Sequence, residues 1–213
     1  MFRAKIGILT NVPKEKSEYK NRFIFSIFVK NIHMYGLVNK AIKDLVVTNH
    51  GEEIWKEICK LSNFEDEEFV GMNPYPDKLT YDLVKNASHI LKADAADILE
   101  AFGEYWILYT ANEGYGDLMD ISGSSFVEFL NNMDMLHYRI NNIMPELVAP
   151  QFTTRNEKEN SIGLEYRSHR EGLTPMLIGL IKGLGKRFDM ICQIEQIVFK
   201  GPDSDCHVFK ITW

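Results

Sequence analysis

The sequence predicts an α+β fold, in which an N-terminal helical subdomain precedes an antiparallel four-stranded sheet with one packed helix. Three observations favour this class. Apolar residues recur at helical spacing for about a hundred residues from Met34 onward. Beyond Pro150 the apolar pattern alternates residue by residue, which is typical of strands. One further apolar helix, from Met176 to about Lys186, interrupts the alternating segments, so helices come first and the sheet carries a helix.

The helical half divides at recognisable breaks. His50-Gly51 and the prolines at 74 and 76 mark the first two breaks, and the glycines at 114 and 116 mark a third. Asp94 is expected to cap the helix that runs through Trp106. A serine at 124 or 125 opens the next helix. The apolar stripe of that helix contains Phe126, Phe129, Leu130, Met133, Leu136 and Ile140.

The second half reads as strands around one helix. Residues 151–155 and 161–170 are predicted strands joined by the polar turn 156–160. Thr174-Pro175 combines an N-cap with a proline at the first helical position, and basic residues close the same helix where its dipole favours them. Residues 190–199 and 207–213 alternate again and supply the remaining strands.

Residues 1–33 differ from the rest of the chain. The segment is basic, whereas the remainder is acidic, and its apolar cluster at 23–29 is too short to span a bilayer. A second methionine, Met34, stands where the periodic pattern begins. We therefore expect a domain over residues 34–213, preceded by an extension outside the fold or by the product of an overextended start of translation.

Composition excludes several classes of protein. The 213 residues are 45% hydrophobic and 25% charged, as in globular proteins. A net charge of −6 argues against a nucleic-acid-binding face, and the absence of 18 consecutive apolar residues argues against a membrane span. Three widely separated cysteines fit neither a disulfide framework nor a zinc site, so we expect a reducing, cytoplasmic setting.

Tyr166, Ser168 and Arg170 alternate along the predicted strand 161–170. Because strand side chains change face at every residue, a phenol, a hydroxyl and a guanidinium would point together. Arginine can bind a carboxylate through two parallel hydrogen bonds, so the row suits a ligand with two carboxylates and an apolar body. An ordinary polar edge strand would show the same residues.

His137 lies in the apolar stripe of its helix, four residues after Met133. A histidine in such a stripe is often a core residue with one hydrogen bond. One helical histidine is also what a five-coordinate haem iron requires, and two haem propionates would then need the donors of the strand. Each feature accounts for the other.

Five segments together resemble the H-NOX family, the haem–nitric oxide/oxygen-binding domains related to the sensor domain of soluble guanylate cyclase. They are Met34-Tyr35-Gly36-Leu37-Val38-Asn39, Phe102-Gly103-Glu104-Tyr105-Trp106, Glu113-Gly114-Tyr115-Gly116, Leu136-His137 and Tyr166-x-Ser168-x-Arg170. The resemblance runs from Met34 to the C-terminus and looks closest to stand-alone bacterial and cyanobacterial members.

The resemblance implies a haem b (iron protoporphyrin IX) buried between helices and sheet, and it implies a role for each matched residue. His137 would be the proximal iron ligand, and Tyr166, Ser168 and Arg170 would hold the propionates. Pro150 would press on the porphyrin and help to bend it. The distal pocket would be lined by Val38, Trp106 and Met176.

The implied function is a haem-based gas sensor rather than an enzyme. Oxygen-binding members carry a tyrosine five residues after the motif arginine, and here Pro175 stands at that position. We therefore expect binding of NO and CO and exclusion of O2, although the Trp106 indole N–H is a donor that would support O2. NO would break the iron–histidine bond and signal to a separate protein, such as a histidine kinase or a cyclic-dinucleotide enzyme. A haem carrier or storage protein, an O2-binding sensor and a binder of another dicarboxylate remain alternatives.

Overall fold

The computed structural model describes residues 33–65 and 68–213. The predicted extension therefore lies outside the described residues, apart from His33. His33 belongs to a short strand, β1 (His33–Tyr35), which pairs antiparallel with β2 (Pro74–Pro76). The prolines that marked a loop in the sequence thus also form a strand, because extended backbone suits proline at the edge of a two-stranded sheet.

The N-terminal half is a group of helices around their own core. These are α2 (Gly36–His50), α3 (Glu52–Leu61), α4 (Asp77–Leu91) and α5 (Ala95–Thr110). The break at His50-Gly51 is confirmed, with Gly51 at a φ of 86° between α2 and α3. Asp94 caps α5 as predicted, because its carboxylate accepts the Ala96 N–H at 2.8 Å. Trp55, Ile58 and Leu83 are fully buried in this core.

The connection to the second half is built from short helices. A kinked segment, η1 (Ala111–Tyr115), leads into α6 (Gly116–Asp120), and α7 (Phe126–Asn131) and α8 (Met133–Ile143) follow. The kink lies within η1 at Glu113 and Gly114, and Gly114 has a φ of 89°. Ser125 opens α7 by accepting the Glu128 N–H. The single helix predicted after Ser125 is divided at Asn132, whose side-chain amide donates to the Ser122 carbonyl.

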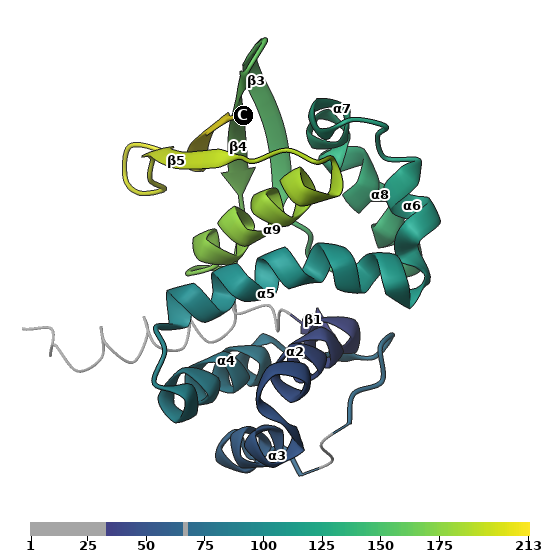
Figure 1. The fold of residues 1–213 in the computed structure, drawn as a ribbon, viewed down its shortest axis with the longest axis vertical. Coiled ribbons are helices and arrows are strands. Elements are labelled where there is room, and N and C mark those ends of the chain that lie inside the picture. Colours follow the sequence, from purple (N-terminus) through teal and green to yellow (C-terminus); the bar gives the residue numbers. More distant parts are fainter. Residues whose placement is uncertain (1–32, 66–67) are drawn as a thin grey trace, which may run out of the picture. The chain divides into compact units, whose positions relative to one another are not determined.

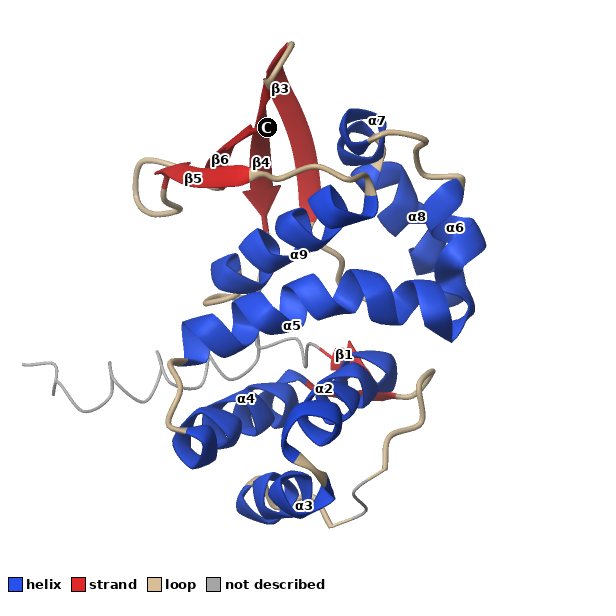
Figure 2. Ribbon diagram, viewed as in Figure 1, coloured by secondary structure: helices blue, strands red, loops and turns tan. Residues whose placement is uncertain are grey.

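The C-terminal half is a four-stranded antiparallel sheet in the order β3-β4-β6-β5, and α9 packs on it. Its elements are β3 (Gln151–Lys158), β4 (Ser161–Arg167), α9 (Thr174–Arg187), β5 (Gln193–Val198) and β6 (His207–Thr212). The strands β3–β6 gather at one end of this part of the chain and α2–α4 at the other (Figure 2). Leu164 of β4, Phe209 of β6 and Ile181 of α9 meet in a second core. The predicted α+β class is confirmed.

Helices α5 and α9 run side by side between the two cores (Figure 1). Glycines allow the close approach: a Cβ atom on Gly179 would lie 1.9 Å from the Glu100 carbonyl oxygen, and one on Gly103 would lie 2.1 Å from the Met176 carbonyl oxygen. Two ion pairs flank the contact, Lys182–Glu100 and Lys186–Glu104, each at 2.5 Å. Among the described residues no helix is both long enough and apolar enough to cross a membrane.

Candidate functional site

A large apolar pocket lies between the helical core and the sheet core. Helices α2, α5, α8 and α9, strand β4 and the segment before β3 all contribute to its walls. The walls include every residue that the sequence assigned to the site: Val38, Trp106, His137, Pro150, Tyr166, Ser168, Arg170 and Met176. The fold therefore collects in one space side chains that are spread over most of the chain.

His137 extends into this pocket from α8. Its Nδ1 atom lies 2.8 Å from the Met133 carbonyl oxygen one helical turn earlier. With Nδ1–H donating to that carbonyl, the tautomer is fixed and Nε2 keeps its lone pair for a ligand. Burial lowers the pKa of the His137 imidazole below its usual value, and the Met133 carbonyl and Asp134 oppose this shift more weakly. The imidazole is thus held neutral, as metal coordination requires.

Phe152 supports the histidine from β3. Its ring centroid lies 5.3 Å from that of His137, at 32° between the ring planes, and 5.5 Å from that of Tyr166. The Phe152 N–H donates to the Asp134 carboxylate of α8 at 2.6 Å. Sequence reasoning missed this link, although the alternation of β3 would have placed Phe152 on the inner face of the sheet.

Tyr166, Ser168 and Arg170 lie at one end of the pocket, but they do not share a strand as predicted. Strand β4 ends at Arg167, and the chain bends after it, so only Tyr166 belongs to the strand. Ser168 Oγ accepts the Arg170 N–H at 3.0 Å and holds this bend. Burial raises the pKa of Tyr166, which keeps its phenol protonated as a donor. The three side chains still converge on the pocket.

The Arg170 guanidinium is engaged by the protein itself. Its Nε–H and one Nη2–H bind the Asp77 carboxylate at 2.7 and 3.3 Å. A second Nη2–H donates to the His33 carbonyl at 3.0 Å, and one Nη1–H donates to the Val148 carbonyl at 2.7 Å. The two-bond fork predicted for a ligand carboxylate is thus directed at Asp77, a residue that sequence reasoning missed. An acid at a helix start is also favourable to the dipole, so the sequence alone did not single it out.

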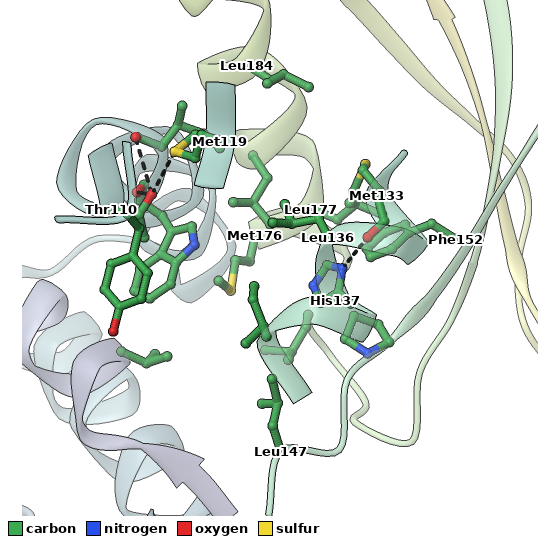
Figure 3. A pocket seen from close by; sticks show the side chains of 18 of the residues that line it. Thr110, Met119, Met133, Leu136, His137, Leu147, Phe152, Met176, Leu177 and Leu184 are labelled. Carbon is green, nitrogen blue, oxygen red and sulfur yellow. Dashed lines mark hydrogen bonds between the residues drawn. The ribbon is translucent and has the colours of Figure 1, made fainter. Parts of the chain in front are cut away.

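Met176 faces His137 across the pocket (Figure 3). Counting five residues from Arg170 pointed to Pro175, but Pro175 is not among the residues that line the pocket. Both residues belong to the first turn of α9, and successive side chains of a helix point in directions about 100° apart around its axis. Neither a proline nor a thioether offers an O–H or N–H donor.

Trp106 lines the same pocket from α5. The indole N–H of Trp106 is a hydrogen-bond donor among the residues that line this pocket. The nearby Thr110 hydroxyl donates to the Trp106 carbonyl at 2.8 Å (Figure 3). The Trp106 indole is therefore the side chain whose N–H could donate a hydrogen bond to bound O2.

Comparison with known proteins identifies the class of site. A family model described as "Haem-NO-binding" matches residues 35–196. The chain belongs to the Haem-NO-binding family. It is 31% identical over 161 residues to soluble guanylate cyclase gcy-32 of Caenorhabditis elegans, and 26% identical over 155 residues to soluble guanylate cyclase 89Da of Drosophila melanogaster. These matches cover 74% and 73% of this chain, but only 24% and 23% of the cyclases, so the chain spans about a quarter of their length.

Solved structures show the same fold. The H-NOX protein from S. oneidensis in the Fe(II)NO state superposes with a TM-score of 0.76 at 22% identity, covering 84% of this chain and 98% of that chain. The Fe(II) unliganded H-NOX protein from K. algicida superposes with a TM-score of 0.74 at 22% identity, covering 84% and 96%. The predicted membership of the H-NOX family is confirmed, and the domain is of the haem-binding sensor type.

The pocket fits a haem chemically. Among the described residues no group of three or more His, Cys, Asp or Glu side chains is arranged to hold a metal ion. His137 is the residue that would hold a haem iron in this pocket. The neutral imidazole, the apolar walls and the donors of Tyr166, Ser168 and Arg170 at one end match the iron, the ring and the carboxylates of that group.

Proposed function

We propose that residues 34–213, together with His33, form a sensor domain that binds NO and CO at a ferrous haem b and excludes O2. One observation carries the proposal: His137, held by the Met133 carbonyl with Nε2 free, shares a pocket with Tyr166, Ser168 and Arg170. His137 would be the axial iron ligand, and the other three would grip the propionates. Pro150 would press on one face of the ring, and Val38, Trp106 and Met176 would surround the gas ligand.

Ligand selection would depend on the hydrogen-bond donors that line the pocket opposite His137. Bound O2 gains superoxide character and needs a hydrogen bond, whereas NO and CO bind ferrous haem without one. The thioether of Met176 supplies no such bond. The Trp106 N–H specifically favours a second candidate, an O2-binding sensor, and the spectrum in air separates the two.

Signalling would use His137 as the moving part. If NO binding released His137 from the iron, α8 would lose that restraint, while Tyr166, Ser168 and Arg170 would keep their contacts with the propionates. The two states then present different surfaces to a partner. We infer a separate cytoplasmic partner, such as a histidine kinase or a cyclic-dinucleotide enzyme.

Absorption spectra of the purified ferrous protein test this function. We expect a retained Soret band, a shift with NO, a different shift with CO, and no stable oxy spectrum in air. Loss of the haem during purification would favour a carrier, and a stable oxy spectrum would favour the O2 sensor. A protein that takes up no haem at all would contradict every haem-based function.

A further inference from the structure

Arg170 joins segments that are far apart in the sequence. Four of the five N–H groups of its guanidinium are used by Asp77, His33 and Val148, which leaves one Nη1–H for a ligand. The ion pair with Asp77 is buried, because the two side chains are only 6% and 13% exposed. A buried pair of this kind is favourable only when its geometry and remaining hydrogen bonds are satisfied, and here the two backbone carbonyls satisfy them.

Helix α4 contacts the same segment at a second point. Asp77 is the first residue of α4, and Tyr81 follows one turn later. The Tyr81 hydroxyl donates to the Glu171 carbonyl at 3.1 Å, one residue beyond Arg170. The first two turns of α4, which belong to the helical half, thus hold both the side chain and the backbone of the segment that follows β4.

We propose that Asp77 is a positioning residue for the haem carboxylates, acting through Arg170. This inference rests on the proposed haem-binding function. Asp77 binds one edge of the Arg170 guanidinium and fixes the orientation of its plane. The remaining Nη1–H and the positive charge therefore already have the right position when a propionate binds. A fixed guanidinium loses less rotamer freedom when it binds, which strengthens the grip.

Asp77 could either position Arg170 for a propionate or compete with the propionate for it. Asp77 and a propionate are both anions, and a pure competitor for Arg170 would weaken haem binding. The Asp77 carboxylate, however, accepts hydrogen bonds from Nε and Nη2 of Arg170, whereas the remaining N–H of Arg170 is on Nη1. The two carboxylates therefore use different edges of one guanidinium. Tyr81 supports the arrangement by holding the backbone at Glu171.

The experiment compares the loss of haem with the loss of a haem whose carboxylates are esterified. Asp77→Asn keeps the size of the side chain and removes its charge. Asp82→Asn is the matched control, since Asp82 lies on the same helix and pairs with the exposed Lys78. Each protein is loaded with haem or with iron protoporphyrin IX dimethyl ester, and the rate of transfer to apomyoglobin is measured. The propionate bending band in the resonance Raman spectrum is recorded in parallel.

We expect Asp77→Asn to speed the loss of haem about tenfold, the lower end of effects seen when a residue that orients a ligand is removed. Loss of the dimethyl ester should be unchanged, the propionate band should shift, and Asp82→Asn should match the wild type. Tyr81→Phe should also speed the loss of haem, but by a smaller factor. This variant provides the test if Asp77→Asn does not fold.

Three results would overturn the inference while leaving the proposed function intact. Slower haem loss from Asp77→Asn would mean competition, equal acceleration for both forms of haem would mean a general structural role, and no difference from Asp82→Asn would mean no role. A wild-type protein that binds no haem would instead overturn the proposed function and this inference together.

Discussion

At the scale of single residues, one helical position decides which side chain faces a ligand. Met176 lines the pocket and Pro175 does not. The two are neighbours in sequence, and only the rotation of α9 separates them. Counting five residues from Arg170 pointed to Pro175, whereas the pocket is lined by Met176, which the resemblance also assigned to it, and neither residue has a donor.

Met176→Tyr tests this placement. A phenol at position 176 would donate to bound O2, and a hydrogen bond to a charged group contributes about 1.5–3 kcal/mol, or roughly tenfold to a hundredfold in affinity. We expect Met176→Tyr to give a stable oxy spectrum in air. Pro175→Tyr is the matched control and should give none. An oxy spectrum from Pro175→Tyr alone would show that position 175 faces the ligand after all.

At the scale of elements, the α5–α9 pair forms one wall of the pocket in a fixed register. Gly103 and Gly179 have no side chains to hold the two helices apart, and two lysine–glutamate pairs flank the contact. Trp106 of α5 and Met176 of α9 line the pocket from this pair. The distance between the helices thus sets the width of this part of the pocket.

Gly179→Ala should disrupt that register. The added methyl group would meet the Glu100 carbonyl oxygen at 1.9 Å, and the helices would have to move apart. Overpacking of this kind costs about 3 kcal/mol, and the better helix propensity of alanine returns about 1 kcal/mol, so we expect a net loss near 2 kcal/mol.

Urea unfolding of the haem-free protein measures this loss. Gly201→Ala is the control, because a Cβ atom there meets nothing within 4 Å, and it should change stability by less than about 0.5 kcal/mol. Equal stability of the two variants would show that α5 and α9 can separate at little cost.

Several local features of these elements could be predicted from the sequence. Asp94 and Ser125 cap helices as expected, and Gly51 ends α2, because each acts on backbone within a few residues of itself. The break at Asn132 and the end of β4 at Arg167 were not predicted. Both depend on contacts that are not local, since Asn132 binds Ser122 and Arg170 binds three distant segments.

At the scale of the whole domain, the pocket lies between two cores rather than inside either one. The helical core and the sheet core each bury their own apolar residues, and α8 carries His137 to the space between them. A ligand bound there would contact both halves. Release of one contact can therefore change how the halves are held without unfolding either core.

His137→Gly tests this idea. Under the proposed mechanism, the variant with ferrous haem and no imidazole should reproduce the NO-bound state of the wild type, because both would lack the bond between the iron and His137 of α8. Hydrogen exchange of α8 and of residues 144–150 is the measurement, and we expect increased exchange in both. Free imidazole should return the variant to the unliganded pattern. Exchange that is the same in the variant and in the unliganded wild type would contradict the switch.

The sequence by itself determined the class of fold, the order of helices and strands, and the residue types that suit a haem. These follow from periodicity and from short motifs, whose physical causes act within a few residues. The tertiary structure decided which side chains meet. Asp77 and Arg170 are 93 positions apart, and they pair only because α4 lies against the segment that follows β4. No local pattern encodes such a contact, since its energy is gained only when the two halves come together.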